Sequence, residues 1–258
     1  MDGWKVLCQG ATEKVVLAID FGVTGRPEAG FADLVSQLDG DFTVWESLPP
    51  PGGGVEALSG EDYVAHWLAG VHPAEESTVA VFGFCVGAVF AGRLAEAFVS
   101  ETGRRPEIVL FDPETPDPKT LFRDFRGAVD RLSALLPDEK LTAAQAEGEE
   151  IYGRLRDYSP LCFELAELFG RTTKMAFDLA GLDPEIGAEV AGTFTSYVSY
   201  LRAANELGRP RSWSDAIAMS SFPLDEGSGI GRRMEFETDH GEILRTHAVA
   251  QAVRRILT

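Results

Sequence analysis

Short apolar runs rich in β-branched and aromatic residues alternate with longer runs of helical periodicity along most of this chain. The strand-like runs are residues 4–8, 14–21, 42–46, 78–84, 107–112, 215–221 and 232–237, and the helical runs are residues 28–38, 60–71, 86–100 and 243–257. This alternation is typical of a doubly wound, mainly parallel sheet with helices on its faces. The sequence therefore predicts an α/β fold.

One long segment interrupts the alternation. Residues 118–212 carry helical patterns and hardly any strand pattern, with helices expected at 121–136, 142–158, 161–180 and 184–206. A chain of 258 residues that is 45% hydrophobic can bury a large core within one domain. We therefore expect a single domain over residues 1–258, with a helical insertion at 118–212.

Charge and composition restrict the classes of partner. The chain carries 41 acidic and 23 basic residues, a net charge of −18, which repels nucleic-acid backbones and anionic membrane surfaces. No apolar stretch approaches the roughly 18 residues of a membrane span, and the first residues do not resemble a signal peptide. The three cysteines, Cys8, Cys85 and Cys162, lack metal-ligand spacing. We expect a reduced, cytoplasmic protein with no metal, no nucleic-acid partner and no membrane association.

The segment Gly83-Phe84-Cys85-Val86-Gly87 has the pattern of a nucleophile elbow. It follows an apolar strand and precedes a small-residue helix start, so the reactive residue lies at the bend. The flanking glycines relieve crowding in the turn, and the helix N-terminus favours a thiolate. A cysteine beside glycines is often only packed in a core. The strand-turn-helix context favours Cys85 as a nucleophile.

A nucleophile of this kind needs a base, and the chain has four histidines. His240 lies in Thr238-Asp239-His240-Gly241, after the last strand and before the terminal helix, where this kind of fold returns a loop to the carboxyl edge of the sheet. His66 and His247 fall within helical patterns and His72 precedes a proline, which favours packing or surface roles. The sequence predicts His240 as the base.

Two aspartates could orient that histidine. Asp112 ends the strand after the elbow helix, and Asp225 follows the next strand. Acidic residues at strand ends also cap loops without any catalytic role. We prefer Asp112 and keep Asp225 as the alternative acid.

An oxyanion hole requires two backbone N–H groups directed at the developing negative charge. One is expected from Val86, the residue after the nucleophile, and the other from Val23, in the glycine-containing loop after an early strand. The alternative interpretation is that this loop is an ordinary glycine-containing turn with no catalytic role.

Four segments together resemble the thioesterases of polyketide and nonribosomal peptide assembly lines, which have the α/β-hydrolase fold. They are Phe21–Gly25 (FGVTG), Gly83–Ala88 (GFCVGA), Leu110–Pro113 (LFDP) and Asp239–Arg245 (DHGEILR), and the resemblance covers roughly residues 14–113 and 232–257. It implies the α/β-hydrolase fold with the helical insertion as a lid, and it supports Asp112, because the family's acid follows the first strand after the elbow helix. The family usually has serine in the elbow and often a glycine pair after the early strand.

Cysteine in place of serine changes the expected acyl-enzyme from an oxoester to a thioester. Amines and carbanions attack thioesters readily, whereas the gain for water is small. The chain resembles the Cys-containing Dieckmann cyclases that release tetramic acids or pyridones, and also aminoacyl shuttles. The resemblance implies a Cys-His-Asp enzyme that releases a polyketide or peptide from a carrier protein through a Cys85 acyl-enzyme, by intramolecular Dieckmann cyclisation.

The resemblance also implies the partners and leaves alternatives. The partners are an acyl or peptidyl carrier protein and a small-molecule acyl substrate, with no cofactor beyond the carrier's phosphopantetheine. The alternatives are an editing (type II) thioesterase that hydrolyses acyl-carrier thioesters and an acyl shuttle between carrier proteins. A dienelactone-type hydrolase would use Asp225 as the acid, and a non-catalytic binding protein is disfavoured because Cys85, Asp112 and His240 are all present.

Overall fold

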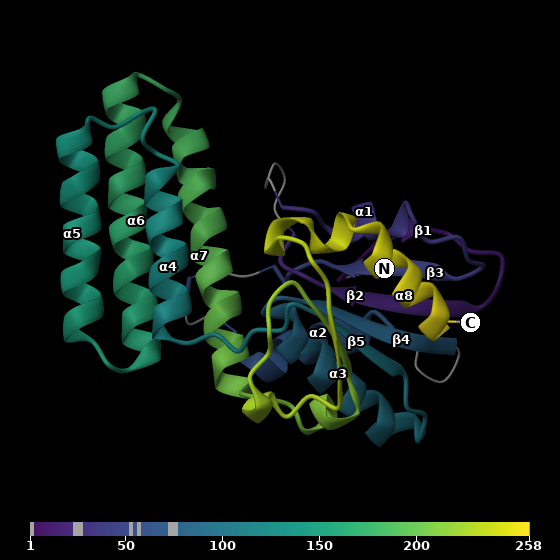
Figure 1. Cartoon of the computed structure of the whole chain (residues 1–258). Helices are drawn as coiled ribbons and strands as arrows, with labels where there is room; N and C mark the ends of the chain where they lie inside the picture. Colours follow the sequence, from purple (N-terminus) through teal and green to yellow (C-terminus); the bar gives the residue numbers. More distant parts are fainter. Residues whose placement is uncertain (1–2, 23–27, 52–53, 56–57, 72–76, 258) are drawn as a thin grey trace. The chain divides into compact units, whose positions relative to one another are not determined.

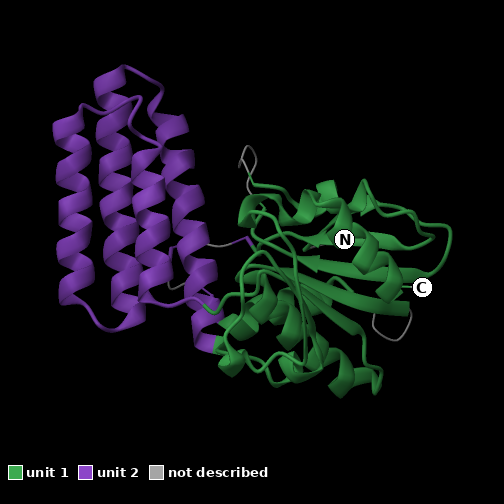
Figure 2. Cartoon of the chain, viewed as in Figure 1, with its two compact units in different colours: residues 1–50, 60–115, 207–258 green, residues 51–59, 116–206 purple. Residues whose placement is uncertain are grey.

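The computed structural model describes residues 3–22, 28–51, 54–55, 58–71 and 77–257. The chain divides into two compact units (Figure 2): unit 1 holds residues 1–50, 60–115 and 207–258, and unit 2 holds residues 51–59 and 116–206. The helices expected at 118–212 therefore belong to unit 2, which ends at residue 206 and also takes in residues 51–59.

Unit 1 is built on a seven-stranded sheet in the order β1-β3-β2-β4-β5-β6-β7. The strands are β1 (Trp4–Cys8), β2 (Lys14–Ile19), β3 (Thr43–Ser47), β4 (Ser77–Phe84), β5 (Glu107–Phe111), β6 (Ile217–Ser220) and β7 (Arg232–Glu235). Among the described strands, β1 pairs antiparallel with β3, and the other pairings are parallel. The predicted α/β fold with a mainly parallel sheet is confirmed. The strand order reverses between β2 and β4, and ligands of such sheets bind at the carboxyl ends of the strands beside this reversal.

Helices cover both faces of this sheet (Figure 1). The helices of unit 1 are α1 (Phe31–Val35), α2 (Gly60–Ala69), α3 (Gly87–Thr102) and α8 (His247–Leu257), with 3-10 turns η1 (Arg211–Asp215), η2 (Glu226–Ser228) and η3 (His240–Arg245). Side chains of α1, η3 and α8 share one buried cluster with alternate residues of the central strands, whereas α2 and α3 pack together on the opposite face. The alternation arises because successive side chains of a strand point to opposite faces.

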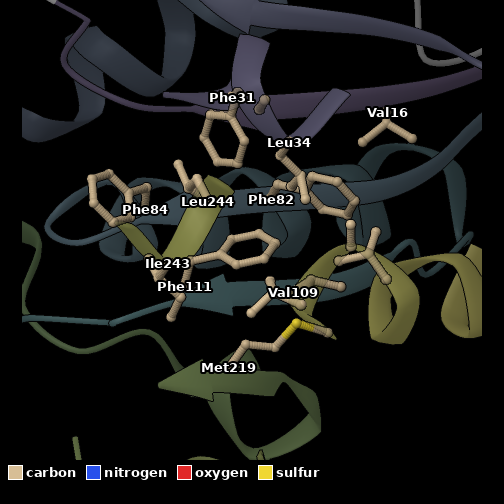
Figure 3. Close-up of a cluster of buried hydrophobic side chains, with 14 of the residues drawn as sticks. Val16, Phe31, Leu34, Phe82, Phe84, Val109, Phe111, Met219, Ile243 and Leu244 are labelled. Atoms are coloured by element: carbon tan, nitrogen blue, oxygen red, sulfur yellow. The ribbon is translucent and has the colours of Figure 1, made fainter. Parts of the chain in front are cut away.

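An aromatic cluster fills the centre of the sheet face that α1, η3 and α8 cover (Figure 3). The Phe82 ring in β4 lies 5.6 Å from the Phe111 ring in β5, and Phe31 of α1 lies 5.8 Å from Phe111. All three are fully buried, and burial of each ring stabilises the fold by about 2–3 kcal/mol. This packing fixes the carboxyl ends of β4 and β5, where the predicted nucleophile and acid follow.

Unit 2 consists mainly of the helices α4 (Pro118–Asp130), α5 (Asp138–Arg154), α6 (Tyr158–Ala180) and α7 (Pro184–Leu207). Phe169 of α6 and Phe194 of α7 lie 4.3 Å apart, ring to ring. The Arg202 guanidinium donates to the carbonyl oxygens of Val55 and Leu58, which joins these two residues to α7. Among the described residues, no helix combines the length and the hydropathy that crossing a membrane requires.

Candidate active site

Cys85 lies at the sharp turn between β4 and α3 and adopts a positive φ of 51°. This conformation is uncommon for a residue with a side chain. The turn also requires glycine at position 83, because a Cβ there would lie 2.6 Å from Ala88 Cα and 2.8 Å from Ala88 N. The Cys85 N–H donates to the carbonyl oxygen of Phe111 at 2.9 Å, which fastens the turn to the end of β5.

Asp112 is held at the end of β5 by hydrogen bonds from two neighbouring loops. It adopts a φ of 44° and is buried. Its Oδ1 accepts the Ser221 N–H at 2.6 Å, and its Oδ2 accepts the Ser221 hydroxyl at 2.8 Å. The remaining partner of Oδ2 is His240 Nδ1, also at 2.8 Å. These bonds satisfy a buried carboxylate, which would otherwise be costly to bury.

His240 begins the turn η3, and its ring is positioned on two sides. The ring stacks on Phe84 with centroids 5.0 Å apart and an interplanar angle of 17°. The next residue, Gly241, accepts the Ala29 N–H through its carbonyl oxygen at 2.7 Å, which anchors the loop. Since the aspartate carboxylate accepts from Nδ1, the neutral ring carries its proton there and leaves the Nε2 lone pair unprotonated. The His240 side chain is 45% exposed, so part of the ring is open to solvent.

Glu114 contacts the sulfur of Cys85, a feature that the sequence analysis did not identify. The Cys85 thiol donates to Glu114 Oε2 with an Sγ–Oε2 distance of 3.5 Å, and the Glu114 N–H donates to the carbonyl oxygen of Cys85 at 3.2 Å. Glu114 follows Asp112 by two residues, so the segment after β5 supplies both carboxylates. No motif marks it, and its place after the acid is the only signal in the sequence.

Of the two residues predicted to form the oxyanion hole, the structure describes Val86 and not Val23. Val86 is buried and immediately precedes α3, where N–H groups of a helix start lack acceptors within the helix. Val23 lies outside the described residues. The loop that leads to it starts from a fixed point, because the Ser47 hydroxyl donates to the Asp20 carbonyl oxygen at 3.0 Å and accepts the Asp20 N–H at 3.1 Å.

The structure brings Cys85, Asp112 and His240 to one edge of the sheet, and the carboxylate that His240 contacts is that of Asp112. Asp225 is exposed and precedes η2. His66 lies in the last turn of α2, and His247 begins α8, where its Nε2 lies 3.0 Å from Gln251 Nε2. His72 lies outside the described residues.

The three cysteines have different surroundings. Cys85 is half-buried at the turn, and Cys8 in β1 is also half-buried, with its thiol donating to the Phe42 carbonyl oxygen at 3.6 Å. Cys162 is fully buried within unit 2, and burial raises the pKa of its thiol to about 12. A thiol with so high a pKa is a poor nucleophile at neutral pH.

No group of three or more His, Cys, Asp or Glu side chains within the described part of the chain is arranged to hold a metal ion. Two surface hollows lie along α3 and η1 and are lined mainly by polar residues, among them Arg93, Glu96 and Arg211. Neither includes Cys85, Asp112 or His240, so they are separate from the candidate site.

Solved structures similar to this chain share the α/β-hydrolase fold. The Vlm2 thioesterase domain bound with a dodecadepsipeptide is 19% identical, with a TM-score of 0.53 over 98% of this chain and 96% of that one. The NocB thioesterase domain in covalent complex with a fluorophosphonate nocardicin G analog is 13% identical, with a TM-score of 0.54 over 96% of each chain. A bromoperoxidase from Bacillus anthracis is 14% identical, with a TM-score of 0.50 over 98% of this chain and 94% of that one.

Sequence comparison does not assign the chain to a family. No protein-family model matches the chain, and no curated protein matches it significantly. The structural likeness therefore shows the fold alone, and the chain has the α/β-hydrolase fold predicted from its motifs.

Proposed function

We propose that this chain releases a polyketide or peptide from a carrier protein through an acyl-enzyme on Cys85, by intramolecular Dieckmann cyclisation. The observation that carries the proposal is the Asp112 Oδ2–His240 Nδ1 hydrogen bond of 2.8 Å at the same sheet edge as the positive-φ Cys85. A nucleophile, a base and a group that orients the base are the parts that acyl transfer requires.

The first step is transfer of the acyl group to the enzyme. Cys85 Sγ forms a bond to the thioester carbonyl carbon, and the bond from that carbon to the phosphopantetheine sulfur breaks. His240 Nε2 takes the thiol proton and returns it to the departing thiolate. The positive charge that develops on the ring is stabilised by Asp112, whose carboxylate is fixed by two bonds from Ser221. The N–H groups of Val86 and Val23 are proposed to bind the oxyanion.

The second step uses the reactivity of a thioester. With an N-(β-ketoacyl)aminoacyl group on Cys85, the carbon between the two carbonyls is acidic enough for an imidazole base. His240 Nε2 removes that proton, the carbanion forms a C–C bond to the thioester carbonyl carbon, and the C–Sγ bond breaks. The proton then passes to the Cys85 thiolate, which restores the free enzyme. An α-aminoacyl group gives a tetramic acid, and a β-aminoacyl group gives the six-membered dihydro form of a pyridone.

The thioesterase neighbours support a carrier-bound substrate by analogy of fold. The Vlm2 and NocB domains are both named as thioesterases. We infer an acyl or peptidyl carrier protein as partner and no cofactor beyond the carrier's own phosphopantetheine. The cysteine is the reason to prefer cyclisation over hydrolysis, because a carbanion gains more than water from a thioester acceptor.

The test is mass spectrometry of the products formed from a β-ketoacyl-aminoacyl thioester. A ring that is one water lighter than the free acid, formed by the wild type and not by Cys85→Ala, is the expected result. Free acid as the main enzyme-dependent product would replace cyclisation by editing hydrolysis. Transfer of the acyl group to a second carrier thiol would indicate a shuttle.

A further inference from the structure

The contact between Glu114 and the nucleophile points to the substrate class. Glu114 has no place in the steps above, although its Oε2 lies 3.5 Å from Cys85 Sγ. A carboxylate so close to the reacting sulfur also lies close to any group that becomes bonded to that sulfur. We propose that Glu114 selects acyl groups with an N–H on the carbon next to the thioester carbonyl, namely α-aminoacyl and N-acyl-aminoacyl thioesters. This inference rests on the proposed Cys85 acyl-enzyme.

Bond lengths show that the Glu114 carboxylate can reach the α-nitrogen of an acyl group on Cys85. In an aminoacyl group on Cys85, three bonds separate Sγ from the α-nitrogen: sulfur to carbonyl carbon, carbonyl carbon to α-carbon, and α-carbon to nitrogen. Sulfur and nitrogen therefore lie about 3–4 Å apart. A carboxylate oxygen 3.5 Å from Sγ can thus accept a hydrogen bond from that nitrogen after a small rotation of the acyl group.

The backbone keeps Glu114 beside the sulfur in the acyl-enzyme. The Glu114 N–H donates to the Cys85 carbonyl oxygen, and this backbone bond is not broken when Sγ is acylated. The preceding residue, Pro113, has its own φ fixed by its ring, which limits how far the backbone before Glu114 can move. Acylation removes the thiol hydrogen that Glu114 Oε2 accepts in the free enzyme. An N–H donor on the acyl group replaces that hydrogen, whereas a plain fatty or polyketide chain does not. Hydrogen bonds to charged acceptors are among the stronger ones in proteins.

Two matched thioesters test this selection. They are the N-acetylalanyl and 2-acetoxypropanoyl thioesters of N-acetylcysteamine, which have nearly the same shape and differ by N–H against O. The rate of mass addition to Cys85 is measured for each, and each rate is divided by the rate of reaction with a small thiol in solution. For the wild type we expect the amide to be preferred by about tenfold or more, the range of a charge-assisted hydrogen bond.

Variants locate the source of the preference. Glu114→Gln keeps the size and one acceptor oxygen but removes the charge, so the preference should fall severalfold. Glu114→Ala should bring the ratio to within about twofold of unity. Glu107→Gln, at the opposite end of β5, removes the same charge and should keep the wild-type ratio, which controls for the net charge of the chain.

The outcomes separate this inference from the proposed function. Acylation of wild-type Cys85 with a ratio near one would overturn the selection and leave the acyl-enzyme standing. A preference that survives in Glu114→Ala would also overturn it, because another group would then be responsible. If neither thioester adds mass to Cys85, the acyl-enzyme itself fails and the selection fails with it.

Discussion

Replacing Asp112 with asparagine should disable the base while leaving the fold in place. The Oδ1 atom accepts the Ser221 N–H, and Oδ2 accepts both the Ser221 hydroxyl and His240 Nδ1. An asparagine must keep its oxygen toward the Ser221 N–H, since an amide NH₂ there would face another donor. Its NH₂ group then points at His240 and requires Nδ1 to accept. The ring proton moves to Nε2, and the base is lost.

The size of the effect follows from this inversion of the tautomer. In comparable triads, the same substitution lowers kcat by about 10⁴-fold, or about 5 kcal/mol of transition-state stabilisation. Stability should change much less, by about 1–2 kcal/mol, because the Ser221 hydroxyl can rotate to accept from the new NH₂ group. The assay is the rate of mass addition to Cys85 from an activated thioester at pH 8, with urea unfolding measured in parallel.

Asp225→Asn is the matched control, since Asp225 was the alternative acid and is exposed before η2. It should acylate at the wild-type rate. An Asp112→Asn rate within tenfold of the wild type, in a protein that still unfolds cooperatively, would refute the role assigned to Asp112. A large loss in Asp225→Asn would assign that role to Asp225.

Three further predictions concern packing, the nucleophile and a buried thiol. Gly83→Ala should lower the free energy of unfolding by about 1–3 kcal/mol, because its Cβ would lie 2.6 Å from the Ala88 backbone; an unchanged urea midpoint would contradict the close approach. Cys85→Ser should lose more activity in ring formation than in hydrolysis, since its acyl-enzyme is an oxoester; equal losses in the two product channels would count against a carbanion acceptor. Because burial raises the pKa of Cys162 to about 12, its contribution to stability is complete below about pH 9 and is lost as the pH rises toward 12. Cys162→Ala should flatten this part of the pH profile of urea unfolding, and an identical profile would refute the assignment.

The strands were predictable because their signal is local. Each of the seven predicted strands is present within a few residues of its expected ends. Two predicted helices differ from the observed ones where the backbone is extended. The helix expected from residue 28 begins at Phe31, because Gly30 before it is extended, with φ −113° and ψ 179°. The helix expected over 243–257 is divided by Thr246, whose extended backbone separates η3 from α8.

The candidate site was predictable only as far as its motifs extend. The elbow, Asp112 and His240 each stand at a recognisable junction of strand, turn and helix. Ser221 and Glu114 do not, and their positions beside Asp112 and Cys85 depend on how distant segments pair. The parallel pairing of Phe111 with Met219 carries Ser221 to Asp112, and the hydrogen bond from the Glu114 N–H to the Cys85 carbonyl oxygen carries a second carboxylate to the sulfur. Pairing between strands distant in sequence is not visible in a single sequence.

The most direct test of the central claim is intact-protein mass spectrometry after mixing with an N-acyl-aminoacyl thioester, followed by peptide mapping. A covalent adduct of the acyl mass on the peptide that contains Cys85, formed by the wild type and by neither Cys85→Ala nor Asp112→Asn on the same timescale, is the predicted result. An adduct on Cys8 instead, or turnover by Cys85→Ala at the wild-type rate, would contradict the account.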